Sequence, residues 1–255
     1  MQNGYSSVRC EADIQKTYTV KDLRYIAGHS IGIIAVDLKY PKLPGNVVNA
    51  TTYPFPVLYK KVEFKIEQLF EGDETLKQTI IDAAKQLQKE GVRAVVGACG
   101  FFANFQKDVA DALEIPAFLS SMIQLPMIKT GLKTGKKIGI ITASGNDITD
   151  KMLLEMGVQP QDCYIEDIGS KEGFQTIRYE YEYLDNESVS KTVVDAAKNL
   201  VEKHDDVGAI LLECSDIPPY AYMVQEAVGL PVFDFITMIN WAHHATTQKP
   251  YFGYF

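Results

Sequence analysis

The sequence has little of what marks several large protein classes. It contains four cysteines and one tryptophan in 255 residues, and none of the cysteines forms a C-x-x-C pair. Neither a zinc knuckle nor a disulfide framework is therefore indicated. No stretch approaches the roughly 18 apolar residues of a transmembrane helix, and the first residues carry no apolar run of signal-peptide length. We expect a cytoplasmic protein with reduced thiols and no membrane partner.

Motifs for nucleotide, zinc-protease and hydrolase chemistry are missing as well. No G-x-G-x-x-G follows a predicted strand, and no P-loop, H-E-x-x-H or G-x-S-x-G occurs. Basic residues number 25 against 33 acidic ones, a net charge of −8, which argues against a nucleic-acid partner. A small anionic ligand stays open, because backbone amides and helix N-termini bind anions locally. We expect no metal and no cofactor.

What the sequence does contain is an internal duplication. The tetrapeptide Asp-Ala-Ala-Lys occurs at 82–85 and again at 195–198, each time before an apolar strand signal that ends at a cysteine, Cys99 or Cys214. A proline follows each cysteine after 17 residues (116 − 99 and 231 − 214). A repeat of this kind predicts two similar lobes.

Apolar runs alternate with amphipathic helical patterns along both halves. The runs at 30–36 and 137–142 are typical of strands covered on both faces, as in parallel sheets. Apolar stripes predict helices over 74–90 and 147–156, and a further helix capped by Ser188. This alternation predicts an α/β fold of two pseudo-symmetric, doubly wound lobes with parallel sheets and the active site in the cleft between them.

The expected domain boundaries follow from the repeat. Residues 1–28 form an N-terminal extension outside it, residues 29–133 plus 237–255 the first lobe, and residues 134–236 the second. The last helix, near 237–247, is expected to return to the first lobe. The extension could lie over a neighbouring subunit, so a homo-oligomer remains open.

Each repeated cysteine is expected at the carboxyl end of a strand, just before a helix. That edge of an open α/β sheet is where ligands bind, and a helix N-terminus favours thiolate over thiol. Thiols on both sides of one carbon can invert a stereocentre, because one removes a proton while the other delivers one. The alternative is core packing, which is common for free cysteine; we expect it for Cys163, which has no counterpart in the first half, and regard Cys10 as incidental.

The two lobes with a cysteine turn in each resemble the aspartate/glutamate racemase superfamily over about 31–245. That superfamily also holds hydantoin racemases, arylmalonate decarboxylases and maleate isomerases. The resemblance implies that Cys99 and Cys214 are the paired acid and base of a reaction that needs no cofactor, pyridoxal phosphate included. Members with one of the pair tend to decarboxylate or isomerise, so both cysteines together favour racemisation or epimerisation.

The flanking residues depart from the racemase pattern of Cys-Asn-Thr in one lobe and Gly-Cys-Thr in the other. The corresponding segments here are Ala98-Cys99-Gly100-Phe101 and Glu213-Cys214-Ser215-Asp216. Ser215 can replace the threonine hydroxyl as a carboxylate donor, whereas Gly100 leaves only backbone N–H groups. The departure weakens aspartate and glutamate as substrates, and the Pro-rich loop at 41–56 is similar to that of a less characterised branch.

Further substrate-binding candidates lie on the same predicted edge. The loop at 37–56 is long for a strand-to-helix connection, which makes it a functional candidate. Each candidate has an ordinary alternative: turn chemistry, a helix cap, a favourable helix start or core packing. Besides the two cysteines and their neighbours Gly100 and Ser215, the candidates are Asn46, Asn49, Phe101, Ser120, Thr142, Ser144 and Asp216.

Three functions follow. The first is a cofactor-independent racemase or epimerase acting on a small carboxylate through both cysteines. The second is a decarboxylase or cis–trans isomerase of the same fold, in which one cysteine acts and the other only lines the pocket. The third is a non-catalytic protein that binds a small molecule. A strong asymmetry between variants of the two cysteines would favour the second.

Overall fold

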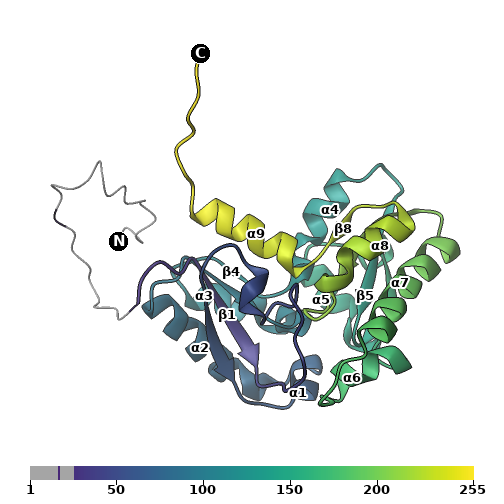
Figure 1. The fold of residues 1–255 in the computed structure, drawn as a ribbon, viewed down its shortest axis with the longest axis horizontal. Helices are drawn as coiled ribbons and strands as arrows, with labels where there is room; N and C mark the ends of the chain where they lie inside the picture. The colour runs from purple at the N-terminus through teal and green to yellow at the C-terminus, as the bar shows by residue number, and fades with distance from the viewer. Residues whose placement is uncertain (1–16, 18–25) are drawn as a thin grey trace.

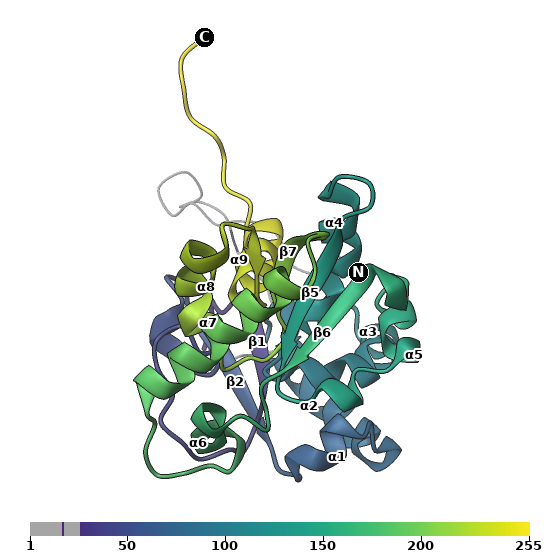
Figure 2. The same cartoon turned by 90° about the vertical axis from the view of Figure 1, so that its right-hand side faces the viewer.

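The structure is a computed structural model that describes residue 17 and residues 26–255, and it contains two parallel sheets (Figures 1 and 2). The strand order is β2-β1-β3-β4 in one sheet and β6-β5-β7-β8 in the other. Every paired strand runs parallel to its neighbour. The α/β class and the pseudo-symmetry predicted from the repeat are therefore confirmed. The strands are β1 (Ile31–Val36), β2 (Val57–Val62), β3 (Ala94–Gly97), β4 (Ala117–Phe118), β5 (Lys137–Thr142), β6 (Cys163–Asp167), β7 (Val207–Leu212) and β8 (Val232–Phe233).

Helices connect the strands and cover the sheets. The two long ones, α2 and α7, make the equivalent crossover in each lobe and carry the repeated tetrapeptide. Each buries one apolar stripe, as amphipathic helices do. The helices are α1 (Ile66–Phe70), α2 (Lys77–Lys89), α3 (Gln106–Ala112), α4 (Leu125–Gly131), α5 (Asp150–Glu155), α6 (Gln175–Arg178), α7 (Asn186–Lys203), α8 (Ala221–Val228) and α9 (Phe235–Thr246).

The N-cap of α7 corrects one detail of the sequence prediction. Asp185, not Ser188, caps this helix, and its side chain accepts the backbone N–H of Ser188 at 3.1 Å. Both residue types are good caps, but the carboxylate also interacts favourably with the positive end of the helix dipole. The helix therefore begins at Asn186, before the serine that the sequence pattern suggested.

The core explains how the lobes are held together. The largest buried cluster contains side chains of both sheets, with Ile34 and Val95 from the first and Ile138 and Ile140 from the second. Because protein interiors are close-packed, a shared core of this kind fixes the two sheet edges relative to one another. Cys163 is part of this cluster, as expected for a packing role.

Helix α9 lies against the first sheet although it follows the second in sequence (Figure 1). Its buried side chains, Phe235 and Met238 among them, pack with Ile31 and Ile33 of β1 and with Val96 of β3. The last helix therefore packs on the sheet of the first half of the chain. In the described part of the chain, no helix is long and apolar enough to span a bilayer. Cys10 and most of the N-terminal extension lie outside the described residues.

Candidate active site

The two cysteine turns meet across the boundary between the lobes. Cys99 follows β3 and caps a 3-10 helix at 100–105, and Cys214 follows β7. The Ser215 hydroxyl donates a hydrogen bond to the Ala98 carbonyl at 2.9 Å. The Val47 N–H donates to the Ser215 carbonyl at 3.3 Å. Strand ends that are distant in sequence are thus joined into one site.

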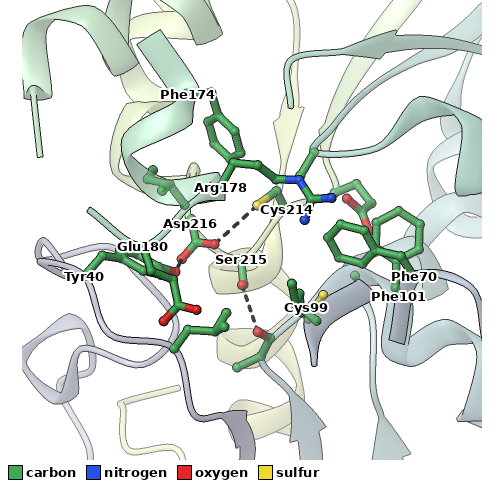
Figure 3. A pocket seen from close by; sticks show the side chains of 17 residues that line it. Tyr40, Phe70, Cys99, Phe101, Phe174, Arg178, Glu180, Cys214, Ser215 and Asp216 are labelled. Carbon is green, nitrogen blue, oxygen red and sulfur yellow. Dashed lines mark hydrogen bonds between the residues drawn. The ribbon is translucent and has the colours of Figure 1, made fainter. Parts of the chain in front are cut away.

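A pocket with an empty volume of about 500 Å³ lies between these turns (Figure 3). Both cysteines belong to its wall. Apolar and aromatic side chains make up most of the remaining wall, a composition typical of small-molecule sites. The lining residues are Leu38, Tyr40, Ile66, Phe70, Ala98, Cys99, Gly100, Phe101, Ala143, Phe174, Ile177, Arg178, Glu180, Glu213, Cys214, Ser215 and Asp216.

Cys99 is a thiol without a side-chain hydrogen-bond partner that the structure records. Burial raises its pKa well above the ordinary value, and Glu213 in its ionised form adds to the effect. The Phe101 backbone N–H and the positive charge of Arg178 act in the opposite direction but are smaller. The balance keeps Cys99 protonated at neutral pH.

Cys214, by contrast, is part of a side-chain network. Its Sγ donates to Oδ2 of Asp216 at 3.5 Å. The other carboxylate oxygen, Oδ1, accepts hydrogen bonds from the Tyr40 hydroxyl and, at 2.6 Å, from Nδ2 of Asn46. Burial raises the pKa of Cys214 well above the ordinary value, and the charges of Asp216 and of ionised Glu213 raise it further. A thiol held against an oriented carboxylate is the arrangement in which a neighbouring base can take the thiol proton.

Arg178 supplies a cation at another part of the pocket wall. Its guanidinium lies 4.6 Å above the Phe70 ring, whose centroid is 4.5 Å from that of Phe101. Nη1 is buried without a hydrogen-bond partner, although it forms an ion pair with Oε1 of Glu67 at 3.5 Å. A buried guanidinium N–H without a partner is costly, so this group is suited to an incoming carboxylate.

Two carboxylates of the pocket wall, Glu180 and Asp216, lie away from the guanidinium (Figure 3). In Figure 3, Glu180, Asp216 and Tyr40 lie on one side, and the Arg178 guanidinium points toward Phe70 on the other. Glu180 accepts the Lys39 backbone N–H, which places it next to Tyr40. Lys42 lies behind Tyr40, with Nζ 3.3 Å from the ring centroid, and is not part of the wall. The pocket therefore has an acidic end and a cationic end.

Glu213 lies in the pocket wall where the two lobes meet. It is only 1% exposed, and its Oε2 accepts a hydrogen bond from the Thr142 hydroxyl at 2.9 Å. A Cβ placed on Gly100 would lie 1.5 Å from Oε1 of Glu213. Glycine follows Cys99 because the carboxyl group of the other lobe occupies the space of a side chain.

The structure brings six of the candidate residues together and places the others elsewhere. Cys99, Gly100, Phe101, Cys214, Ser215 and Asp216 line the pocket. Two more lie behind the wall, Asn46 against Asp216 and Thr142 against Glu213.

The other three candidates form hydrogen bonds with groups close to them in sequence: Asn49, Ser120 and Ser144. Asn49 and Ser120 accept backbone N–H groups as caps of short 3-10 helices, and Ser144 donates to Asp147 at 2.5 Å. None of the three lines the pocket, because a local partner already takes each side chain. Asn49 and Ser120 thus act as helix caps, whereas Ser144 makes no side-chain cap hydrogen bond.

Several wall residues carry no signal in the sequence. Phe70, Arg178 and Glu180 come from helix ends and a loop without periodicity, and only the fold brings them to the cysteines. Tyr40 lies in the long loop at 37–56, which the sequence marks as a functional candidate without singling out this residue. Glu213 does carry a sequence signal, because a carboxylic acid directly after a buried apolar strand such as β7 is unusual. Across residue 17 and residues 26–255, no group of three or more His, Cys, Asp and Glu side chains is arranged to hold a metal ion.

The fold and the site define a two-lobed α/β protein with a pair of thiols in a pocket between its lobes. The model of the family described as Asp/Glu/Hydantoin racemase matches residues 59–242. The chain therefore belongs to the Asp/Glu/hydantoin racemase family. This agrees with the resemblance carried by the two cysteine turns.

Curated relatives and solved structures add to this assignment. Dimethylsulfoniopropionate lyase 7 of Emiliania huxleyi (strain CCMP1516) is 34% identical over 236 residues, which cover 88% of this chain and 69% of the relative. Dimethylsulfoniopropionate lyase of Durusdinium sp. clade D is 33% identical over 236 residues, 88% of this chain and 77% of that one. Allantoin racemase from Pseudomonas fluorescens has the same fold, with a TM-score of 0.58 at 14% identity over 88% of this chain and 99% of that one.

Proposed function

We propose that this protein is a lyase that releases dimethyl sulfide from dimethylsulfoniopropionate, leaving acrylate. The relatives described above are named as lyases of this compound. The observation that carries the proposal is the separation of charge in the pocket, with Asp216 and Glu180 at one end and the Arg178 guanidinium at the other. The substrate has a matching separation, because a sulfonium cation and a carboxylate stand at opposite ends of a short carbon chain.

Each end of the pocket suits one end of this substrate. The sulfonium lies against the carboxylates of Asp216 and Glu180 and the Tyr40 ring; the face of an aromatic ring attracts a desolvated cation by about 0.5–2 kcal/mol. The substrate carboxylate pairs with Arg178, whose planar N–H groups match carboxylate geometry. The chain between them then crosses the space between the two cysteine turns.

The reaction is an elimination that needs one base. Cys214 passes its thiol proton to Asp216 and, as the thiolate, takes a proton from the substrate carbon next to the carboxylate. The electron pair of that C–H bond forms the double bond of acrylate. The bond between carbon and sulfur breaks, and its electron pair leaves with dimethyl sulfide. The sulfonium loses its positive charge as Asp216 loses its negative charge.

Cys99 has a lesser part in this scheme. It has no carboxylate partner comparable to Asp216, and it lines the pocket as a thiol. This corresponds to the alternative drawn from the sequence in which one cysteine acts and the other only lines the site. An uncharged thiol at this place leaves the negative end of the substrate without a repelling charge.

The test is product formation by the purified full chain under reducing conditions. We expect dimethyl sulfide in the headspace and an equal amount of acrylate by proton NMR. C214A should abolish both products, whereas C163A, which removes a buried cysteine outside the pocket, should keep them. A wild-type protein that binds dimethylsulfoniopropionate without forming either product would contradict the proposal.

Racemisation is the second candidate, and the observation in its favour is that both lobes keep their cysteine in one pocket. A racemase needs a base on one face of the carbon and an acid on the other, so both thiols would be indispensable. The candidates separate on a panel of chiral carboxylates in deuterated water. Loss of optical rotation with deuterium uptake, and no alkene, would favour the racemase.

A further inference from the structure

Glu213 is a buried acid that the reaction scheme above leaves unused. It directly follows the last residue of β7, is 1% exposed and belongs to the pocket wall. Its Oε2 accepts the Thr142 hydroxyl, but its Oε1 has no hydrogen-bond partner in the described structure. A buried polar atom without a partner is unfavourable, so an acid held in this way at a pocket wall points to a ligand group that completes it.

The position of the free oxygen is fixed by the facing lobe. Oε1 is held where a Cβ on Gly100 would lie only 1.5 Å away. Gly100 and Glu213 both line the pocket, so the oxygen lies where the two lobes meet at the wall. The backbone of Glu213 is also held, because its carbonyl accepts the Ser121 hydroxyl at 3.2 Å.

Hydrogen bonding identifies which oxygen carries the proton when Glu213 is neutral. The Thr142 hydroxyl accepts the Ser144 N–H at 3.2 Å and donates its own proton to Oε2. With Oε2 accepting from Thr142, we assign the acid proton to Oε1, the oxygen without a partner. Burial, with a smaller contribution from Asp216, raises the pKa of Glu213 to about 8, so the neutral acid prevails at neutral pH.

We propose, on the basis of the lyase function above, that Glu213 is a further catalytic residue that donates a hydrogen bond from Oε1 to the substrate carboxylate. Negative charge spreads onto that carboxylate as Cys214 removes the adjacent proton. A donor already in place stabilises this charge without reorganising, which is a large part of enzymatic rate enhancement. The Glu213 proton stays on Glu213, so the balance of the elimination is unchanged.

The charged and titratable groups around Glu213 set its pH response. Asp216, whose charge raises the pKa of Glu213, comes from the turn of Cys214. Cys99 and Cys214, on which the Glu213 charge acts, lie in the two turns, and Arg178, which acts on Cys99, comes from α6. Above pH 8 an ionised Glu213 no longer donates and instead repels a carboxylate. Affinity for a carboxylate should therefore be full below that pH and decrease as pH rises through about 8.

The test uses propionate, a carboxylate without a leaving group, and calorimetry on the full chain. At pH 7 we expect E213A to bind propionate about tenfold more weakly than wild type and E213Q within about threefold, because the amide also donates. The wild-type affinity should fall between pH 7 and pH 9, and the E213Q affinity should stay constant. Binding of trimethylsulfonium, which lacks a carboxylate, should change little in either variant.

Three results would overturn the inference: no propionate binding by wild type, an affinity that does not vary with pH, or E213Q as weak as E213A. The last would mean that Glu213 acts as an anion. Far-UV circular dichroism and the trimethylsulfonium control identify a variant that fails to fold, and in that case the wild-type pH profile still decides. Because propionate is not turned over, a failure of the lyase proposal shows separately as binding without dimethyl sulfide release.

Discussion

The two lobes have the same strand order and the same cysteine turn, but the turns differ in charge. In the first lobe, Cys99 is followed by Gly100 and Phe101 and has no side-chain partner. In the second, Cys214 stands between Glu213 and Asp216 and donates to the latter. Duplication thus supplied a symmetric backbone, and side chains of one lobe made it chemically asymmetric. A pocket built in this way can treat the two ends of a substrate differently.

The largest expected effect comes from removing each cysteine in turn. C214A should lower kcat/KM for dimethyl sulfide release by about 10³-fold, because it removes the base. C99A should lower it by no more than about tenfold. Headspace gas chromatography on matched amounts of both variants, with C163A as the control, measures the difference. Equal losses would break the comparison and favour a two-base reaction.

Replacing Asp216 should have the next largest effect. It should slow the elimination but make the Cys214 thiol easier to alkylate. D216N should lower the rate of elimination by about 10²-fold, because the thiol proton loses its acceptor. The negative charge of Asp216 raises the pKa of Cys214, so its removal should move iodoacetamide alkylation of Cys214 to lower pH. Mass spectrometry of the alkylated peptide reports the shift. A D216N protein with slower alkylation and normal turnover would contradict the assigned role.

Arg178 should affect substrate binding more than the chemical step. R178K keeps the charge but loses the planar pair of donors, so we expect KM to rise about tenfold, roughly 1.4 kcal/mol, with kcat within about threefold. Steady-state kinetics across substrate concentration separate the two constants. K191A, which removes an exposed lysine on α7, is the matched control. A change in kcat alone would place Arg178 outside carboxylate binding.

The contact between Gly100 and Glu213 gives the smallest expected effect, and it concerns stability. G100A should lower the free energy of unfolding by about 1–3 kcal/mol, because the new methyl group overlaps the Glu213 carboxyl. E213A in the same chain should restore part of that loss. Chemical denaturation of the single and double variants measures the coupling. Additive losses would mean that the two residues do not compete for space.

Much of the fold was predictable because its causes are local. Buried runs such as 137–142, apolar helix stripes and the repeated cysteine spacing each leave a regular pattern in sequence, whereas the strand order of each sheet came from the structure. Capping was less predictable, since Asp185 and Ser188 are both competent caps and only the folded turn decides between them.

The site residues also fall into those that a sequence pattern marks and those that only the folded structure reveals. Both cysteines were found because duplication marks them, and Gly100, Phe101, Ser215 and Asp216 because they adjoin the cysteines. Arg178 and Phe70 reach the pocket through tertiary packing, which no local pattern encodes. Asn49 and Ser144 resemble ligand donors in sequence but are taken by neighbouring groups, and this competition is visible only in three dimensions.

One measurement tests the central claim most directly: the fate of dimethylsulfoniopropionate incubated with the reduced protein and followed by proton NMR in a sealed tube. The account predicts equal amounts of dimethyl sulfide and acrylate from wild type and from C163A, slower formation by C99A, and none by C214A. Unchanged substrate with wild type, together with racemisation of a chiral carboxylate that requires both cysteines equally, would contradict it.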